Sequence, residues 1–130
     1  MSPLLLCIPA AFFLVYLPKI AVSVAMGKQP EGYNNRNPRD QQTKLTGWGK
    51  RALGAHLNGF ESFPPFAAGV LIAHVSQANP KHALYLAVGH LACRTLYPVL
   101  YIADVHAARS AVWTLGFIST MWLMLLPLFG

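Results

Sequence analysis

The long apolar segments of this chain are the feature that most constrains its fold. Four of them, at residues 4–26, 57–75, 83–103 and 111–129, each approach the roughly 20 residues that a helix needs to cross a bilayer. They leave too little of the 130-residue chain for a separate soluble domain. Because 55% of the residues are hydrophobic and 11% are charged, the sequence predicts an all-α fold, a four-transmembrane-helix bundle in a single domain.

The turn-forming residues between the apolar segments set the expected helix boundaries. We predict helices at about residues 3–26, 47–76, 82–103 and 109–128. The segment between the first two is rich in Pro, Gly and Asn, so we predict an irregular cytoplasmic loop over about residues 27–46. A loop of this length is usually functional or disordered. The sequence assigns no role to its donor-rich run at residues 35–39.

The basic residues are distributed unevenly along the chain. Six of them lie in or beside the first connection: Lys28, Arg36, Arg39, Lys44, Lys50 and Arg51. Arg109 flanks the third connection, whereas the second contains only Lys81. The positive-inside rule therefore places the first and third connections in the cytoplasm and both termini outside. Since topology accounts for the net charge of +6, we predict membrane lipids as partners and no nucleic acid.

Polar side chains inside the predicted helices are the candidates for function, because such groups are costly in a bilayer and usually functional. An α-helix turns by about 100° per residue, so two of the helices each carry one polar stripe. The stripe of the second helix comprises Arg51, Gly54, Asn58, Glu61 and Pro65. The stripe of the third comprises His90, Arg94, Tyr97, Tyr101 and Asp104.

Glu61 and Arg94 are expected to form an ion pair, since both lie about 15 Å from the cytoplasmic ends of helices that run in opposite directions. Two interpretations stay open for Asn58 and Glu61: hydrogen bonds that hold the helices together, or contacts with a ligand. Three further polar residues would lie nearer the cytoplasm: Tyr97, Tyr101 and Arg109. A cationic, tyrosine-lined cavity there would suit an anionic ligand or a thiolate.

The five histidines are scattered and lack the spacing of a metal site, so no metal is predicted. His56 loosely follows the stripe of the second helix and is a candidate for lining the cavity. The chain contains neither a Gly-rich phosphate-binding loop nor a nucleophile elbow.

Three motifs resemble those of the MAPEG family, the membrane-associated proteins of eicosanoid and glutathione metabolism. Residues 55–66 are similar to the family pattern A-x-x-N-x-x-E-x-x-P-x-F on the second helix. Residues 94–101 are similar to R-x-x-Y-x-x-x-Y on the third. The pair Arg109-Ser110 resembles the Arg-Ser that opens the fourth helix in members of the family. The resemblance covers nearly the whole chain, and the loop and short turns look like the bacterial, little-characterised branch.

The resemblance implies a homotrimer, with glutathione bound as co-substrate between neighbouring subunits near the cytoplasmic side. It implies five contacts with glutathione: Asn58, Glu61, Arg94, Tyr97 and Tyr101. Arg109 would stabilise the thiolate. Many glutathione-binding members carry an arginine where this chain has Gly54, and Arg51, one turn earlier, could take its place. A bacterial protein of this kind would lie in the inner membrane.

The function predicted from the residues and the resemblance is that of a glutathione-dependent transferase or peroxidase. Its second substrate would be a lipophilic electrophile, a small molecule that partitions into the membrane. One alternative is a non-catalytic membrane protein of the same fold that binds a lipid or another small molecule. Another is a small proton-coupled exporter in which Glu61 would be the titrating carboxylate.

Overall fold

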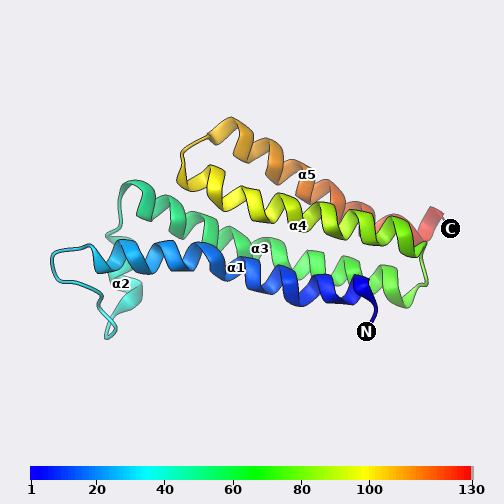
Figure 1. Cartoon of the computed structure of the whole chain (residues 1–130), viewed down its shortest axis with the longest axis horizontal. Coiled ribbons are helices and arrows are strands. Elements are labelled where there is room, and N and C mark those ends of the chain that lie inside the picture. The colour runs from blue at the N-terminus through cyan, green and yellow to red at the C-terminus, as the bar shows by residue number, and fades with distance from the viewer. Residues whose placement is uncertain (130) are drawn as a thin grey trace.

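The protein is all-α in the computed structural model, which describes residues 1–129. Its four long helices are α1 (Pro3–Gly27), α3 (Gly47–Val75), α4 (Pro80–Ile102) and α5 (His106–Leu125). The short helix α2 (Pro38–Thr43) lies between α1 and α3, and the 3-10 helix η1 (Leu126–Phe129) follows α5. The long helices lie side by side as an elongated bundle (Figure 1).

Within residues 1–129, three helical segments are long and apolar enough to cross a membrane: Pro3–Gly27, Pro80–Ile102 and His106–Phe129. Helix α3 is the longest, at 29 residues, but it is not one of them. Its sequence includes Lys50, Arg51 and Glu61, which lower its hydropathy. These segments indicate a multi-pass membrane protein. In it, helix α3 combines the length of a membrane span with a polar face.

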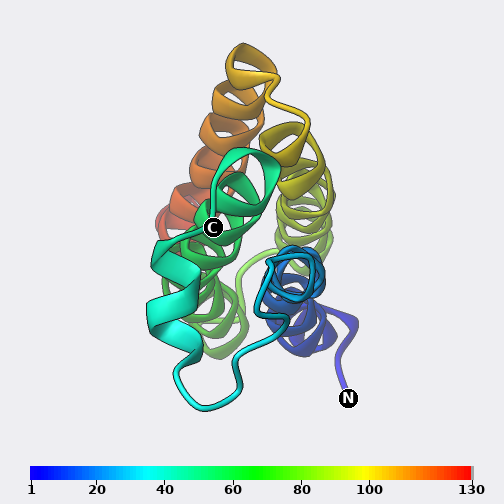
Figure 2. The ribbon, with the colours of Figure 1, turned by 90° about the vertical axis from the view of Figure 1, so that its left-hand side faces the viewer.

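Helices α3 and α4 each contact all three of the other long helices. Helix α3 packs most extensively against α1, and α4 packs most extensively against α5 (Figure 2). Both termini and the α3–α4 turn lie at one end of the bundle (Figure 1). The α1–α3 connection and the α4–α5 turn lie at the opposite end. This arrangement agrees with the predicted topology, in which the first and third connections share one side of the membrane.

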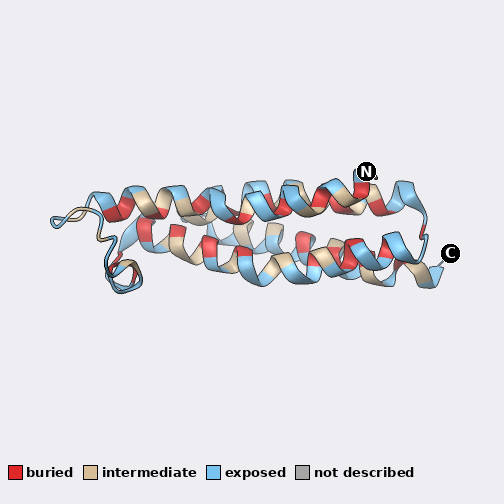
Figure 3. Cartoon of the chain, turned by 90° about the horizontal axis from the view of Figure 1, so that it is seen from below, coloured by how far each residue is buried: buried red, intermediate tan, exposed pale blue. Residues whose placement is uncertain are grey.

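The helices meet through small side chains and expose large ones. Eight buried core residues are alanines: Ala11, Ala25, Ala52, Ala55, Ala73, Ala78, Ala83 and Ala87. Large apolar side chains such as Phe13 and Tyr85 are 70% and 72% exposed. Figure 3 shows buried positions on the facing sides of the helices and exposed positions around the outside. Small residues at helix contacts and apolar residues outside are typical of helices that pack in lipid.

Two helices begin earlier than predicted. Helix α4 begins at Pro80 because Asn79 caps it: the Asn79 Oδ1 atom accepts hydrogen bonds from the backbone N–H groups of Lys81 and His82 at 3.1 and 3.2 Å. Proline is well suited to the first helical position, since its missing N–H has no intrahelical partner there. Helix α5 begins at His106, three residues before the predicted start.

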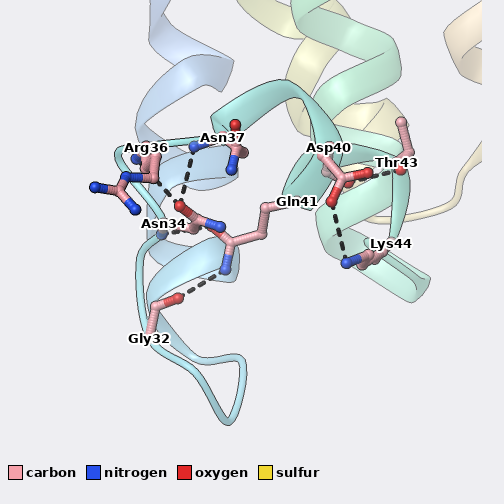
Figure 4. Close-up of polar contacts among 8 residues, drawn as sticks. All are labelled: Gly32, Asn34, Arg36, Asn37, Asp40, Gln41, Thr43 and Lys44. Atoms are coloured by element: carbon pink, nitrogen blue, oxygen red, sulfur yellow. Dashed lines mark hydrogen bonds and ion pairs between the residues drawn. The ribbon is translucent and has the colours of Figure 1, made fainter.

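The first connection is more ordered than the sequence predicts, because the expectation of an irregular loop overlooked α2. The side chain of Gln41, which is 1% exposed, ties this helix to the rest of the loop (Figure 4). Its Nε2 atom donates to the carbonyl of Gly32 at 2.7 Å, and its Oε1 atom accepts from the N–H of Asn34 at 2.8 Å. A buried amide that makes hydrogen bonds to backbone on both sides holds a loop as a turn would.

Asn34 continues this network and forms the entrance to α2. Its Oδ1 atom accepts from the backbone N–H groups of Arg36 and Asn37 at 3.1 and 3.0 Å (Figure 4). This is the geometry by which asparagine stabilises a turn. The ion pair between Lys44 and Asp40, at 3.1 Å, spans one turn at the end of α2 and is well exposed, so we assign it little stabilising energy.

The close approach of α1 and α3 at Gly49 generates a stability prediction. A Cβ atom at Gly49 would lie 2.7 Å from the Cβ of Ala25, a rigid group on a neighbouring helix. We expect Gly49→Ala to destabilise the protein by about 1–3 kcal/mol through this overlap. The matched control is Gly89→Ala, because a Cβ there would have its nearest neighbour, the Ser119 Oγ, at 3.8 Å. Thermal unfolding in detergent should show a lower midpoint for Gly49→Ala alone.

Candidate functional site

A three-residue hydrogen-bond network joins α3 to α4 inside the bundle. Arg94 is 9% exposed, and its Nη1 atom donates to the Oδ1 atom of Asn58 at 2.9 Å. The Nδ2 atom of Asn58 in turn donates to Oε2 of Glu61 at 3.1 Å, one turn along α3. The prediction of an ion pair between Glu61 and Arg94 is wrong, since within residues 1–129 the Glu61 carboxylate and the Arg94 guanidinium do not approach within 4.0 Å. The amide of Asn58 relays between the two charges because it can accept from one and donate to the other.

A cavity, here called the inner cavity, lies beside this network between α3, α4 and α5. Its volume is about 150 Å³. Its lining residues are Asn58, Glu61, Ser62, Pro65, His90, Arg94, Trp113, Gly116, Phe117 and Thr120. The residues from α3 and α4 are mostly polar, whereas Trp113 and Phe117 of α5 form an apolar wall. The ring centroids of these two aromatic side chains are 5.3 Å apart in a stacked arrangement.

A second depression, here called the outer hollow, lies nearer the α4–α5 turn and has a volume of about 440 Å³. It is lined by Tyr97, Tyr101, Arg109, Ser110, Trp113 and Thr114. Trp113 lines both spaces and therefore stands between them. All lining residues of the two spaces come from α3, α4 and α5.

The two tyrosines of α4 form a stack with an arginine at each end, Arg94 of α4 and Arg109 of α5. The guanidinium carbon of Arg94 lies 4.4 Å from the ring centroid of Tyr97, and that of Arg109 lies 4.4 Å from the centroid of Tyr101. The two tyrosine rings meet edge to face, with centroids 5.7 Å apart. A cation over an aromatic face is attracted to the ring and is oriented by it. Arg109 is half-buried, so its remaining N–H donors are available in the outer hollow.

The structure gives a physical reason for the glycine at position 54. A Cβ atom there would lie 2.5 Å from the hydroxyl oxygen of Tyr101 and 2.8 Å from its Cζ, so the tyrosine side chain occupies the space of any larger residue. Arg51 does not replace the missing arginine in either space. Its Nε atom donates instead to the backbone carbonyl of Ile102 at 3.1 Å, near the end of α4. That hydrogen bond gives Arg51 a role in joining α3 to α4.

Sequence reasoning placed His90 on the polar stripe without a role, overlooked Trp113 and misplaced His56. His90 and Trp113 line the inner cavity, although each could have been found by helical spacing, four residues before Arg94 and four residues after Arg109. The hypothesis that His56 lines the cavity is wrong, because its Nδ1 atom lies 2.8 Å from the carbonyl of Val15 at the α1–α3 contact. Residues 1–129 contain no group of three or more His, Cys, Asp or Glu placed to hold a metal ion.

The predicted site residues are otherwise brought together in space. Asn58, Glu61 and Arg94 share the inner cavity, while Tyr97, Tyr101 and Arg109 share the outer hollow. Comparison with known protein families identifies the family of the chain. The MAPEG family model matches residues 3–129, almost the entire chain. The chain belongs to the MAPEG family. Neither a curated protein nor a solved structure matches it significantly.

Membership of the MAPEG family accounts for the architecture in outline. The family fold is a four-helix membrane bundle, and its members are often trimeric. The family includes membrane glutathione transferases and peroxidases, and its members often bind glutathione. The four long helices of this chain correspond to that fold, and α2 lies in the first connection.

The relay through Asn58 predicts an order of mutational effects. We expect Asn58→Ala to destabilise the protein by about 1–3 kcal/mol, because it leaves the buried guanidinium of Arg94 without its amide acceptor. Glu61→Gln should cost less, since Glu61 is exposed and the bond between Asn58 and Arg94 survives. Thermal unfolding of both variants in the same detergent measures the difference. A larger loss for Glu61→Gln would mean that a direct ion pair, and not the relay, holds α3 to α4.

Proposed function

We propose that this protein is a membrane-bound glutathione-dependent transferase or peroxidase that acts on lipophilic electrophiles. The observation that carries the proposal is the position of Arg109, a half-buried cation held on the ring of Tyr101 in an open hollow. A fixed cation of this kind is what a thiolate nucleophile requires. Membership of a family that includes glutathione transferases and peroxidases supports the same conclusion.

The chemistry assigned to Arg109 is stabilisation of the glutathione thiolate. A free thiol has a pKa of about 8.5, so only a few per cent of it is ionised at neutral pH. A guanidinium remains protonated throughout the physiological range and favours the thiolate by direct attraction. The ring of Tyr101 holds the guanidinium in place, so little reorganisation is needed when the thiolate forms.

The remaining site residues supply groups that complement the rest of glutathione, which carries one ammonium and two carboxylate groups. The exposed carboxylate of Glu61 offers an acceptor for the ammonium group. The guanidinium of Arg94 and the hydroxyl of Tyr101 offer donors for carboxylate or peptide oxygens. Arg51 is already bonded to the end of α4, so we assign it a supporting role.

We propose further that the working unit is a homotrimer in the bacterial inner membrane, with both termini outside the cytoplasm. The outer hollow is open, and its lining comes from α4 and α5 alone, so a neighbouring subunit could complete it. Native mass spectrometry or cross-linking of the purified protein in mild detergent should show a trimer. A clean monomer would remove the site between subunits and most of the mechanism with it.

The direct test of the proposed function is calorimetric titration of the purified wild-type protein with glutathione. Heat that saturates in the millimolar range or below is the expected result. The control is the same titration of Lys81→Ala, which removes a cation outside both spaces and should leave the heat of binding unchanged. If the wild type takes up no glutathione at millimolar concentration, the transferase and peroxidase proposals fail.

Arg109→Ala should separate catalysis from binding. Loss of the guanidinium should return the bound thiol pKa toward about 8.5, and turnover at neutral pH should fall by roughly 10- to 100-fold while glutathione affinity changes little. Raising the pH should partly restore the rate, because it ionises the thiol without help. Arg109→Lys should keep part of the activity, since a point charge remains.

The readouts for these variants are the ultraviolet absorbance of the bound thiolate and kcat as a function of pH. Lys81→Ala is the matched control, because it removes a cation at the opposite end of the bundle. If Arg109→Ala lowers only expression or trimer stability and leaves the rate per folded trimer unchanged, Arg109 serves as a lipid-headgroup anchor instead.

A non-catalytic binder of lipid or another small molecule is the second candidate, and the apolar wall of Trp113 and Phe117 in the inner cavity favours it. Retention of a hydrophobic ligand without turnover would support that function. The exporter alternative depends on Glu61, which accepts a hydrogen bond from Asn58. Resistance assays with Glu61→Gln test it, since an exporter would lose its proton coupling.

A further inference from the structure

Lys19 and Arg39 form a pair of cations that has no acidic partner in the structure. Lys19 is half-buried on α1, and Arg39 of α2 lies close enough to repel its ammonium group. The chain has four acidic side chains, and no carboxylate oxygen lies within 4.0 Å of the nitrogen atoms of either cation. The only ion pair of that length within residues 1–129 joins Lys44 to Asp40. Two cations held together beside a membrane helix leave a site that an anion can fill.

Hydrogen bonds hold α2 against the face of α1 that carries Lys19. The Nε2 atom of Gln41 donates to the carbonyl of Met26 at 3.4 Å. Met26 follows Lys19 by seven residues, so the two residues share one helix face and lie roughly 10 Å apart along the axis. The guanidinium of Arg39 is itself held in place, because its Nη1 atom donates to Oε1 of the buried Gln42 at 3.4 Å. The packing of α2 on α1 therefore positions Arg39 near Lys19.

A row of aromatic side chains, here called the aromatic row, runs along α1 and α3 from Lys19 toward the middle of the bundle. It comprises Phe12, Tyr16, Phe60 and Phe63. Phe12 and Tyr16 share the face of α1 that carries Lys19, at helical spacings of four and three residues. The ring centroids of Tyr16 and Phe60 are 5.7 Å apart, as are those of Phe12 and Phe63. Because Phe12, Tyr16 and Phe60 are exposed, the aromatic row offers an acyl chain an apolar surface beside the two cations.

The two cations lie at the level of the lipid headgroups. Lys19 is eight residues, or about 12 Å, before the end of α1 at Gly27. A lysine at this depth extends its ammonium group to the interface along its own methylene stem. Figure 2 shows α2 on the side of α1 and α3 that faces away from α4 and α5, so the site is separate from the inner cavity and the outer hollow. Basic pockets between helices at this level bind anionic headgroups.

We propose that an anionic phospholipid binds here, with its phosphate between the Lys19 ammonium and the Arg39 guanidinium and an acyl chain on the aromatic row. The planar guanidinium can donate to two phosphate oxygens, and the ammonium adds a point charge. A soluble anion would leave the aromatic row uncovered, and a zwitterionic lipid would bring a third cation to the pair. The bound lipid joins α2 to α1, which gives the short helix of the first connection a role. The site does not depend on the proposed glutathione chemistry.

Native mass spectrometry of the full-length protein in mild detergent tests the site. The probes are phosphatidylglycerol and phosphatidylcholine with identical acyl chains, and the readout is the ratio of their affinities. We expect this ratio to fall about fivefold in Lys19→Gln and in Arg39→Gln, the effect of one basic residue at an anionic headgroup. Lys28→Gln is the matched control, because Lys28 follows Lys19 by nine residues, on the opposite face, and lies 5.5 Å from the ring centroid of Trp48. It should leave the ratio almost unchanged.

Substitutions that keep or reverse the charge of Lys19 separate lipid binding from helix packing. Lys19→Arg should retain the preference for phosphatidylglycerol. Lys19→Glu should abolish it and should raise the midpoint of thermal unfolding in lipid-free detergent, because the introduced carboxylate can pair with Arg39. Added phosphatidylglycerol should raise the unfolding midpoint of the wild type but not that of Lys19→Glu.

Three results would overturn the proposal. Equal losses of the preference in Lys19→Gln and Lys28→Gln would mean that the lipid responds only to net charge. Equal stabilisation of the wild type by glycerol phosphate, which has a phosphate group but no acyl chain, would mean that the aromatic row is not used. A changed number of subunits in Lys19→Gln with an unchanged lipid ratio would mean that a second copy of the chain covers this face.

Discussion

The interaction on which the rest of the structure depends is the hydrogen bond between Arg94 and Asn58. A guanidinium in the middle of a membrane bundle must have an acceptor, because an unpaired buried charge is very costly. Asn58 supplies that acceptor at 2.9 Å and links α3 to α4, the two helices that each contact all the other long helices. Its other end meets Glu61, so one amide positions both charged groups of the inner cavity.

The site follows from this bond along α4. Arg94 lies over Tyr97, Tyr97 meets Tyr101 edge to face, and the hydroxyl of Tyr101 fits against Gly54 on α3. The ring of Tyr101 in turn packs against the guanidinium of Arg109, which lies in the first turn of α5. The absence of a side chain at Gly54 lets this stack reach the end of the bundle. Gly54 is thus part of the geometry that positions the Arg109 guanidinium.

The fold and most of the site could be predicted because the relevant signals are local. Apolar length predicts helices, and polar residues spaced three or four apart on one helix share a face. Asn58 and Glu61 were found in this way, and the family that their motif resembles is confirmed by the match over residues 3–129. His90 was placed on the correct stripe but given no role, since its cavity is completed by Thr120 and Gly116, which come from another helix.

The sequence alone determined that the chain is an all-α membrane protein of the MAPEG family, with its basic connections at one end. Those properties depend on composition, periodicity and motifs, which are all local features of the sequence. Only the tertiary structure decided which partner each polar group takes. It placed Asn58 between Glu61 and Arg94, brought Arg51 within hydrogen-bond distance of the last residue of α4, and set the Nδ1 atom of His90 against the Gly116 carbonyl of α5. These hydrogen-bond partners depend on distances of a few ångströms between different helices. The spacing of residues within one helix therefore cannot predict them.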